Sequence, residues 1–281
     1  MSNWVLVTGA SSGIGRATAV RLARQGARVI AGVRSSAVAD ELRAVLGPRS
    51  ATVQFDVTDD GSIQLAAKEV AALTGGSGLH GLVNNAGIAV GGPIEYLEVD
   101  QWREQFEVNV FGQIAVTRAF LPAIRTGQGR IVFVGSNSGR ISVAMMGPYC
   151  SSKHALEAVA ESLRLELRAE HIPVVLIEPG AVRTPIWDKG RRAAAELEQT
   201  LPPQALVRYR DQIDAVHAGI DQQEKSGIDP DRVAAAVQKA LTAARPSPRI
   251  QVGLDASLTA VLDRLLPDRL RPIAVATLSR P

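Results

Sequence analysis

Short runs of β-branched and other apolar residues alternate along the chain with longer stretches in which apolar residues recur every three or four positions. The short runs predict strands, and the longer stretches predict amphipathic helices between them. The predicted strands cover residues 4–7, 28–32, 51–55, 81–84, 130–135 and 173–177, and the predicted helices cover 14–25, 38–46, 63–73, 102–124 and 149–170. Because such alternation implies right-handed crossovers, we expect an α/β fold with a doubly wound parallel sheet.

The pattern changes after Pro185. Residues 188–226 are polar and helical in propensity, with no strand-like run, so we interpret 186–228 as a helical substrate-loop insertion. A further helix over 230–243 and an apolar strand over 250–253 restore the alternation. We therefore expect one domain over 1–263 that contains the insertion. Residues 264–281 carry three prolines and are interpreted as a loosely attached C-terminal tail.

Composition and charge agree with one folded domain. Apolar residues make up 46% of the 281 positions and charged residues 21%, which is enough to bury a sizeable core. The 31 basic and 28 acidic residues are interspersed, so no run of like charge predicts a nucleic-acid partner. Cys150 has no second cysteine to pair with, which favours a reduced, cytoplasmic protein. No signal segment and no stretch of roughly 18 apolar residues is found, so we expect no membrane span.

Glycines cluster where the first strand gives way to a helix, in the string Thr8-Gly-Ala-Ser-Ser-Gly-Ile-Gly15. Glycines there allow a tight turn, a close approach to a pyrophosphate and free helical N–H groups aimed at the anion. The spacing differs from the usual Gly-x-Gly-x-x-Gly fingerprint, but the position favours a Rossmann-type nucleotide turn over a plain loop. The expected cofactor contacts are Gly9, Ser11, Ser12, Gly13, Ile14 and Gly15.

Nucleotide choice is commonly made at the end of the second strand, which here reads Ala31-Gly32-Val33-Arg34. No carboxylate stands about 20 residues after the glycines to bind a ribose hydroxyl. The guanidinium of Arg34 could instead pair with a 2′-phosphate, so NADP(H) is the preferred cofactor and NAD(H) the alternative. The competing interpretation of Arg34 is a solvated surface residue.

Taken together, the motifs resemble the short-chain dehydrogenase/reductase family from Thr8 to about Gly253, in the family's order and spacing. The resemblance implies that Asp56 and Val57 contact the adenine and that Asn84 to Gly87 form a cofactor-lining turn. It also implies a nicotinamide-side loop and an active-site tetrad. These further expected site residues are Asn85, Ala86, Gly87, Pro179, Gly180, Val182 and Thr184 for the cofactor, and Asn109, Ser136, Tyr149 and Lys153 for catalysis.

Tyr149 and Lys153 lie four residues apart, which places a phenol and an ammonium on one helical face. The adjacent positive charge, together with an oxidised nicotinamide, favours phenolate and would lower the tyrosine pKa toward the working pH. Tyr149 is therefore the expected catalytic acid/base. The resemblance adds that Lys153 binds the nicotinamide ribose. Ser136 follows an apolar strand and precedes Tyr149 by thirteen residues, which matches the family's serine. The resemblance therefore implies that its hydroxyl binds the substrate oxygen, with Ser138 as its rival.

Asn109 falls in the middle of a predicted helix. The residues alone favour a helix kink or a core hydrogen bond, whereas the resemblance implies support of a water-linked proton path to Lys153. The histidines at 80, 154, 171 and 217 lack metal-ligand spacing, so no metal is expected.

The stretch 141–147 and the start of the insertion are mostly apolar, which predicts a lipophilic ketone, aldehyde or alcohol as substrate. The expected contacts, besides Ser136 and Tyr149, are Val143, Met145, Ile186 and Trp187; the alternative is that they cover the core. The sequence is similar to the hydroxysteroid and retinol dehydrogenase branch. Residues 188–226 form either a lid or a surface helical pair. The resemblance also implies a homodimer or homotetramer through 102–124 and 149–170.

Other functions remain open on the sequence. A non-catalytic cofactor sensor would carry damaged catalytic positions, whereas the tetrad is complete. A nucleotide-sugar epimerase would have a larger C-terminal domain, and an enoyl reductase a longer interval from tyrosine to lysine. An NAD-dependent alcohol dehydrogenase of the same fold is the nearest alternative.

Overall fold

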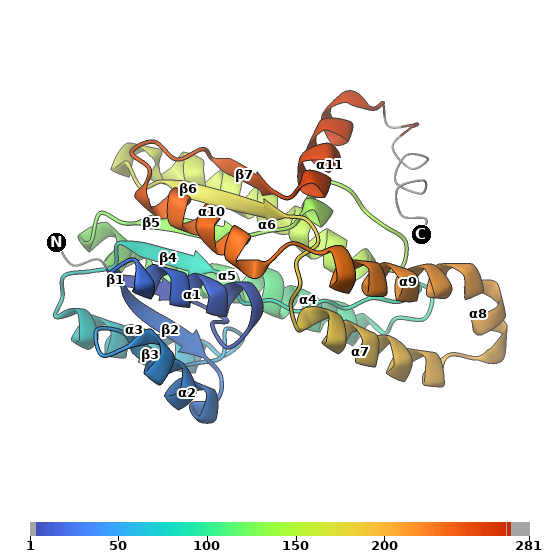
Figure 1. Ribbon diagram of the computed structural model, residues 1–281, viewed down its shortest axis with the longest axis horizontal. Helices are drawn as coiled ribbons and strands as arrows, with labels where there is room; N and C mark the ends of the chain where they lie inside the picture. Colours follow the sequence, from blue (N-terminus) through green and yellow to red (C-terminus); the bar gives the residue numbers. More distant parts are fainter. Residues whose placement is uncertain (1–3, 268, 271–281) are drawn as a thin grey trace.

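The computed structural model describes residues 4–267 and 269–270, and its centre is a seven-stranded parallel sheet. The strand order is β3-β2-β1-β4-β5-β6-β7 (Figure 1). The first six strands follow the doubly wound order that places ligands at the carboxyl ends of β1 and β4. The strands are β1 Trp4–Val7, β2 Arg28–Val33, β3 Ala51–Gln54, β4 Gly81–Asn84, β5 Arg130–Val134, β6 Val174–Pro179 and β7 Arg249–Val252.

Helices cover both faces of this sheet, as the alternating pattern predicts (Figure 1). Apolar stripes of α1, α2 and α10 pack on one face, and those of α3, α5 and α6 pack on the other. Each face thus has its own core, with Leu42 and Val237 in one and Phe120 and Leu156 in the other. The helices are α1 Gly13–Arg24, α2 Ser36–Leu46, α3 Asp60–Thr74, α5 Gly112–Thr126, α6 Gly147–Glu166 and α10 Pro230–Thr242.

The helix predicted over 102–124 is interrupted. The structure has α4 (Val99–Phe106), a π-helical turn (Glu107–Phe111) and then α5. At the junction, a side chain on Gly112 would press on the Val57 carbonyl, since its Cβ would lie 2.7 Å from that oxygen. A π-helical turn adds one residue to a turn without disturbing the apolar recurrence much, so the pattern did not reveal it.

The predicted insertion forms an arm that extends beyond the carboxyl ends of the strands (Figure 1). It comprises α7 (Ile186–Thr200), α8 (Pro203–Arg208) and α9 (Arg210–Ser226), which confirms its helical character. Arg191 in α7 joins α7 to α9 through ion pairs of 2.6 and 2.7 Å with Asp221 and Glu224. Residues Val182 and Ile228 pair as a parallel bridge where the arm begins and ends.

A last helix, α11 (Leu254–Leu265), was not predicted. Its apolar side chains at Leu254, Leu258 and Leu265 are exposed, so they cover no core in this chain. Arg264, where the tail was expected to begin, belongs to this helix, and residues 271–281 of that tail lie outside the described residues. Within 4–267 and 269–270, no helix is both long and apolar enough to cross a membrane.

Candidate functional site

The glycine turn follows β1 directly and lies beside the segment that follows β4. The Thr8 hydroxyl accepts hydrogen bonds from the backbone N–H groups of Asn85 (2.9 Å) and Ala86 (3.0 Å). In return, the Asn85 amide donates to the carbonyls of Thr8 (3.0 Å) and Gly9 (3.3 Å). These bonds hold together the two loops at the point where the strand order reverses, the usual ligand position of this fold.

The conformation of the glycine turn suits a bound pyrophosphate. Gly9 and Gly13 adopt φ of +62° and +54°, a region that other residues rarely enter. Helix α1 begins at Gly13. The side chain of its N-cap residue, Ser12, makes no capping hydrogen bond, and the first turn contains no acidic residue. Its first N–H groups therefore remain available to an anion, as an NAD(P) pyrophosphate requires.

Gly9 and Gly15 also leave no space for a side chain. A Cβ on Gly9 would lie 2.8 Å from the Ala86 Cα, and one on Gly15 would overlap the Gly9 carbonyl and the Asn85 amide. Ser11 is exposed and Ile14 partly buried at the same turn. All six turn residues predicted from the sequence are thus gathered at one junction.

Arg34 follows the last residue of β2, and its side chain is 70% exposed. Its guanidinium lies 3.9 Å from the carboxylate of Asp56, which follows β3 after Phe55. Asp56 is oriented by hydrogen bonds from the Thr58 N–H (2.9 Å) and hydroxyl (2.8 Å). The two predicted adenosine-side residues therefore meet at the same sheet edge, with the guanidinium accessible to a ligand.

Tyr149 lies in the first turn of α6, and its hydroxyl interacts with Ser136, which directly follows Gly135 after β5. Burial raises the pKa of Tyr149, and the interaction with Ser136 opposes that rise. The lowering expected from the sequence depends on the charge of an oxidised nicotinamide as well as on Lys153, and it stays a prediction for the cofactor-bound enzyme. A raised pKa means that Tyr149 holds its proton at neutral pH, as a proton donor must before the reaction.

Ser138, the rival of Ser136, faces another way. Its hydroxyl interacts with the Cys150 thiol, and its N–H donates to the Ser136 hydroxyl at 3.1 Å. Ser138 therefore supports Ser136, and Ser136 is the serine that meets the phenol.

Lys153 lies one turn after Tyr149 and is 6% exposed. Its ammonium donates to the Val134 carbonyl at 3.0 Å and lies 5.8 Å from the centre of the Tyr149 ring. Burial lowers the pKa of Lys153 to about 8 because the charged form loses hydration. Most of the population is still cationic at neutral pH.

Asn109 lies in the π-helical turn and is fully buried. Its carboxamide binds both backbone groups of Ile88, accepting from N–H at 2.9 Å and donating to C=O at 3.0 Å. The residue thus serves as the core hydrogen-bonding group that the residues alone favoured. Sequence reasoning missed its buried neighbours Gln105 and Gln113, whose spacing of four residues on either side was a visible signal.

The predicted nicotinamide-side loop begins inside β6, which ends at Pro179. A Cβ on Gly13 would lie 3.1 Å from the Thr184 side chain, so this loop lies against the glycine turn. Helix α11 holds the loop as well, because the Asp255 carboxylate accepts from the Ala181 N–H at 2.7 Å. Trp187 donates its indole N–H to the Val182 carbonyl at 2.7 Å.

The predicted substrate residues Val143, Met145, Ile186 and Trp187 are all partly buried. Met145 has φ of +67°, a strained conformation for a non-glycine residue, and its carbonyl accepts from the Gly92 N–H at 2.6 Å. No group of three potential metal ligands occurs in the described part of the chain.

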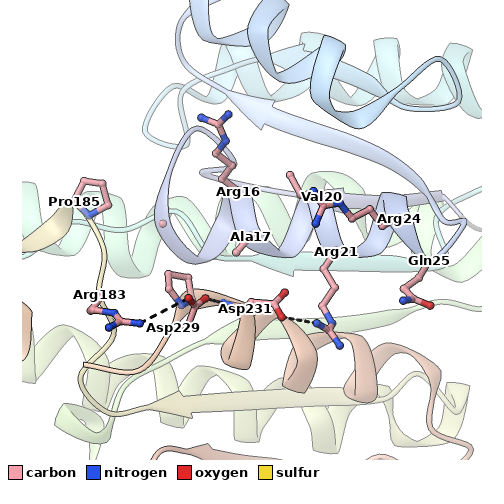
Figure 2. A pocket seen from close by; sticks show the side chains of 12 residues that line it. Arg16, Ala17, Val20, Arg21, Arg24, Gln25, Arg183, Pro185, Asp229 and Asp231 are labelled. Atoms are coloured by element: carbon pink, nitrogen blue, oxygen red, sulfur yellow. Dashed lines mark hydrogen bonds and ion pairs between the residues drawn. The ribbon is translucent and has the colours of Figure 1, made fainter. Parts of the chain in front are cut away.

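A hollow of about 640 Å³ lies between α1 and the start of α10, outside the catalytic residues (Figure 2). Ion pairs flank it, from Arg183 to Asp229 (3.8 Å) and from Arg21 to Asp231 (2.6 Å). Gly13 is the residue of its lining that also belongs to the glycine turn. We therefore assign the chemistry to the tyrosine, serine and lysine and not to this hollow.

Comparisons with known proteins agree with this geometry. The chain matches the short chain dehydrogenase family model over residues 3–195. It is 33% identical over 272 residues to an NADPH-dependent 3-dehydrocapnine reductase of Ornithobacterium rhinotracheale, covering 95% of this chain and 94% of that protein. It is 37% identical over 266 residues to retinol dehydrogenase 5 of Homo sapiens, covering 91% and 82%. A short-chain dehydrogenase structure from Streptomyces avermitilis has a TM-score of 0.77 at 30% identity, covering 99% and 97%. The chain belongs to the short-chain dehydrogenase/reductase family, near its retinol dehydrogenase branch, and is an NAD(P)-dependent oxidoreductase.

Proposed function

We propose that this enzyme is an NADPH-dependent reductase of lipophilic ketones or aldehydes, with Tyr149 as the proton donor. The observation that carries the proposal is the position of Tyr149, whose phenol lies beside Ser136 and whose ring centre lies 5.8 Å from the Lys153 ammonium. A phenol holds its proton at neutral pH and can donate it to a carbonyl oxygen, and the nearby ammonium stabilises the phenolate that results. The partly buried apolar residues Val143, Ile186 and Trp187 support a lipophilic substrate.

Each residue then has a task. The nicotinamide supplies the hydride when bound. Ser136 hydrogen-bonds the substrate oxygen while Tyr149 donates its proton to that oxygen, and the Lys153 ammonium stabilises the resulting phenolate. In the alcohol-oxidising direction the same phenolate accepts the hydroxyl proton.

The proposal is tested by mixing purified protein with NADPH or NADH and a panel of apolar ketones and aldehydes. We expect oxidation of NADPH that depends on an added carbonyl compound and exceeds oxidation of NADH. Faster turnover with NADH would favour the NAD-dependent alternative. Binding of cofactor without any turnover across the panel would favour the cofactor-sensing alternative.

The preference for NADPH is expected to depend on Arg34. Its exposed guanidinium, 3.9 Å from Asp56, is placed to pair with a 2′-phosphate in a charge-assisted bond. Arg34→Ala should therefore weaken NADPH binding by about 10- to 100-fold and leave NADH binding within about twofold. Titration of each cofactor by fluorescence measures both values. Equal weakening of the two cofactors would contradict the assignment.

The two serines are expected to differ sharply on substitution. Because Ser136 meets the phenol and Ser138 meets the Cys150 thiol, Ser136→Ala should lower kcat/KM by about 10- to 100-fold. Ser138→Ala should lower it by less than about threefold. Steady-state rates with one carbonyl substrate compare them. A larger loss of kcat/KM in Ser138→Ala than in Ser136→Ala would assign the substrate-binding role to Ser138.

A further inference from the structure

Three buried carboxamides line the side of α4, the π-helical turn and α5 that faces the segment following β4. Gln105, Asn109 and Gln113 are each at most 1% exposed. Gln113 donates to the Ala86 carbonyl at 3.0 Å, and Asn109 binds both backbone groups of Ile88. Side chains thus supply the hydrogen bonds that a neighbouring strand would otherwise give this extended segment.

Gln105 reaches furthest along the segment and also contacts the catalytic helix. Its carbonyl oxygen accepts from the Val90 N–H at 2.7 Å. Its amide nitrogen donates to the Ile88 carbonyl at 3.1 Å and to the Ser152 hydroxyl at 3.3 Å. Ser152 is itself fully buried and donates to the Tyr149 carbonyl at 2.8 Å. A single hydroxyl therefore separates Gln105 from the backbone turn that carries the phenol and the ammonium.

The other end of the segment leads to the substrate side. Two residues beyond Val90, the Gly92 N–H donates to the Met145 carbonyl at 2.6 Å. Met145 is held at a left-handed φ of +67°, which persists only where surrounding contacts impose it. The Gly92 N–H is one of those contacts, and Val90, which Gln105 binds, lies two residues before it.

We propose that Gln105 is a positioning residue that sets the spacing between the segment Ile88–Gly92 and the Tyr149–Lys153 turn. Through this spacing it fixes the distance from the phenol to the substrate beside Met145. The proposal deepens the proposed function and rests on the role given there to Tyr149. Without the carboxamide, the partly buried Val90 N–H loses its partner and the segment shifts to find another.

Gln105→Met is the first test, because methionine has a similar volume but no comparable hydrogen-bonding groups. A shift of about 1 Å in a catalytic site can cost about 100-fold in rate. We expect kcat to fall by about 10- to 100-fold, while the Kd of NADPH stays within about twofold because the glycine turn is untouched. An unchanged kcat in the folded variant would overturn the proposal.

Gln105→Glu tests the hydrogen bonds through pH. An ionised carboxylate accepts from Val90 but cannot donate to Ile88 or Ser152, whereas a protonated carboxyl regains one donor. The ratio of variant to wild-type kcat should therefore rise as the pH falls from 8 to 5.5. Gln64→Glu makes the same chemical change at an exposed position of α3, and its ratio should be flat. A flat ratio for Gln105→Glu would overturn the proposal. If Gln105→Met does not fold, the measurements on Gln105→Glu replace it as the test.

A double-mutant cycle with Ser152→Ala tests the route. The Ser152 hydroxyl also accepts from the Asn109 amide at 3.3 Å, so Ser152→Ala has an effect of its own. If Gln105 acts on Tyr149 through this hydroxyl, the loss of rate in the double variant should be smaller than the product of the two single losses. Independent effects would multiply and would remove the proposed link to α6.

Hydrogen–deuterium exchange separates this inference from the proposed function. In Gln105→Met, the amides of 88–92 and of 149–153 should both exchange faster than in the wild type, whether or not a substrate is known. Faster exchange in 88–92 with no change in 149–153 would overturn the proposal. If the wild type shows no Tyr149-dependent turnover, the proposed function fails and this measurement alone decides the link.

Discussion

Replacing Tyr149 by phenylalanine should lower the turnover number by about 1,000-fold while the Kd of NADPH changes by less than about threefold. The expected loss follows from the removal of the group that exchanges a proton with the substrate oxygen, which typically contributes 10²- to 10⁴-fold. Cofactor affinity should survive, because the glycine turn and its Asn85 contacts do not involve the phenol. Activity assays with concentrated enzyme measure the turnover number, and a cofactor titration measures the Kd of NADPH.

The matched control for this substitution is Tyr209→Phe in the arm. The Tyr209 hydroxyl donates to the exposed Glu95 carboxylate at 2.9 Å, away from Ser136 and Lys153. Removal of that hydroxyl should leave the turnover number within about twofold. Residual turnover of more than about a tenth in Tyr149→Phe would exclude Tyr149 as the proton donor.

The parts of the fold that the sequence predicted are those in which one segment determines its own structure. The central strands are buried on both faces, so they show as continuous apolar runs such as Val29 to Ala31. The glycine turn was likewise visible because positive φ at Gly9 and Gly13 demands that residue type. The helical arm was identified by its polarity and its lack of strand-like runs.

The parts that sequence reasoning missed depend on contacts between distant segments. Gln105 binds the backbone of Ile88 and Val90. Because every residue has these backbone groups, the identity of the partner residues does not reveal the contact. Helix α11 leaves Leu254, Leu258 and Leu265 exposed, whereas a helix in a core would bury such side chains. The raised pKa of Tyr149 arises from burial by residues far along the chain. A local pattern of phenol and ammonium cannot reveal how much water the fold removes.

The free energy of unfolding should rise with pH in the alkaline range because of Lys153. The ordinary pKa of this side chain is 10.5, and burial lowers it to about 8 in the folded protein. Between these values the unfolded chain binds more protons than the folded one, so raising the pH stabilises the fold. Below pH 8 both states hold the proton and this contribution is flat. Over the whole alkaline range, the deprotonation of Lys153 changes the free energy of unfolding by about 3 kcal/mol, of which about 2 kcal/mol falls between pH 7.5 and 9.5.

Lys153→Met isolates this contribution, because methionine keeps the apolar stem and does not titrate. Urea unfolding of the wild type and the variant at pH 7.5 and 9.5 should show that the wild type gains about 2 kcal/mol relative to the variant. Alkaline groups distant from Lys153 titrate equally in both proteins and cancel in the difference. The same substitution should lower kcat by about 100-fold or more, since the phenolate of Tyr149 loses its stabilising charge. An equal pH dependence in the two proteins would mean that Lys153 keeps an ordinary pKa, and its ammonium would then not be desolvated beside the phenol.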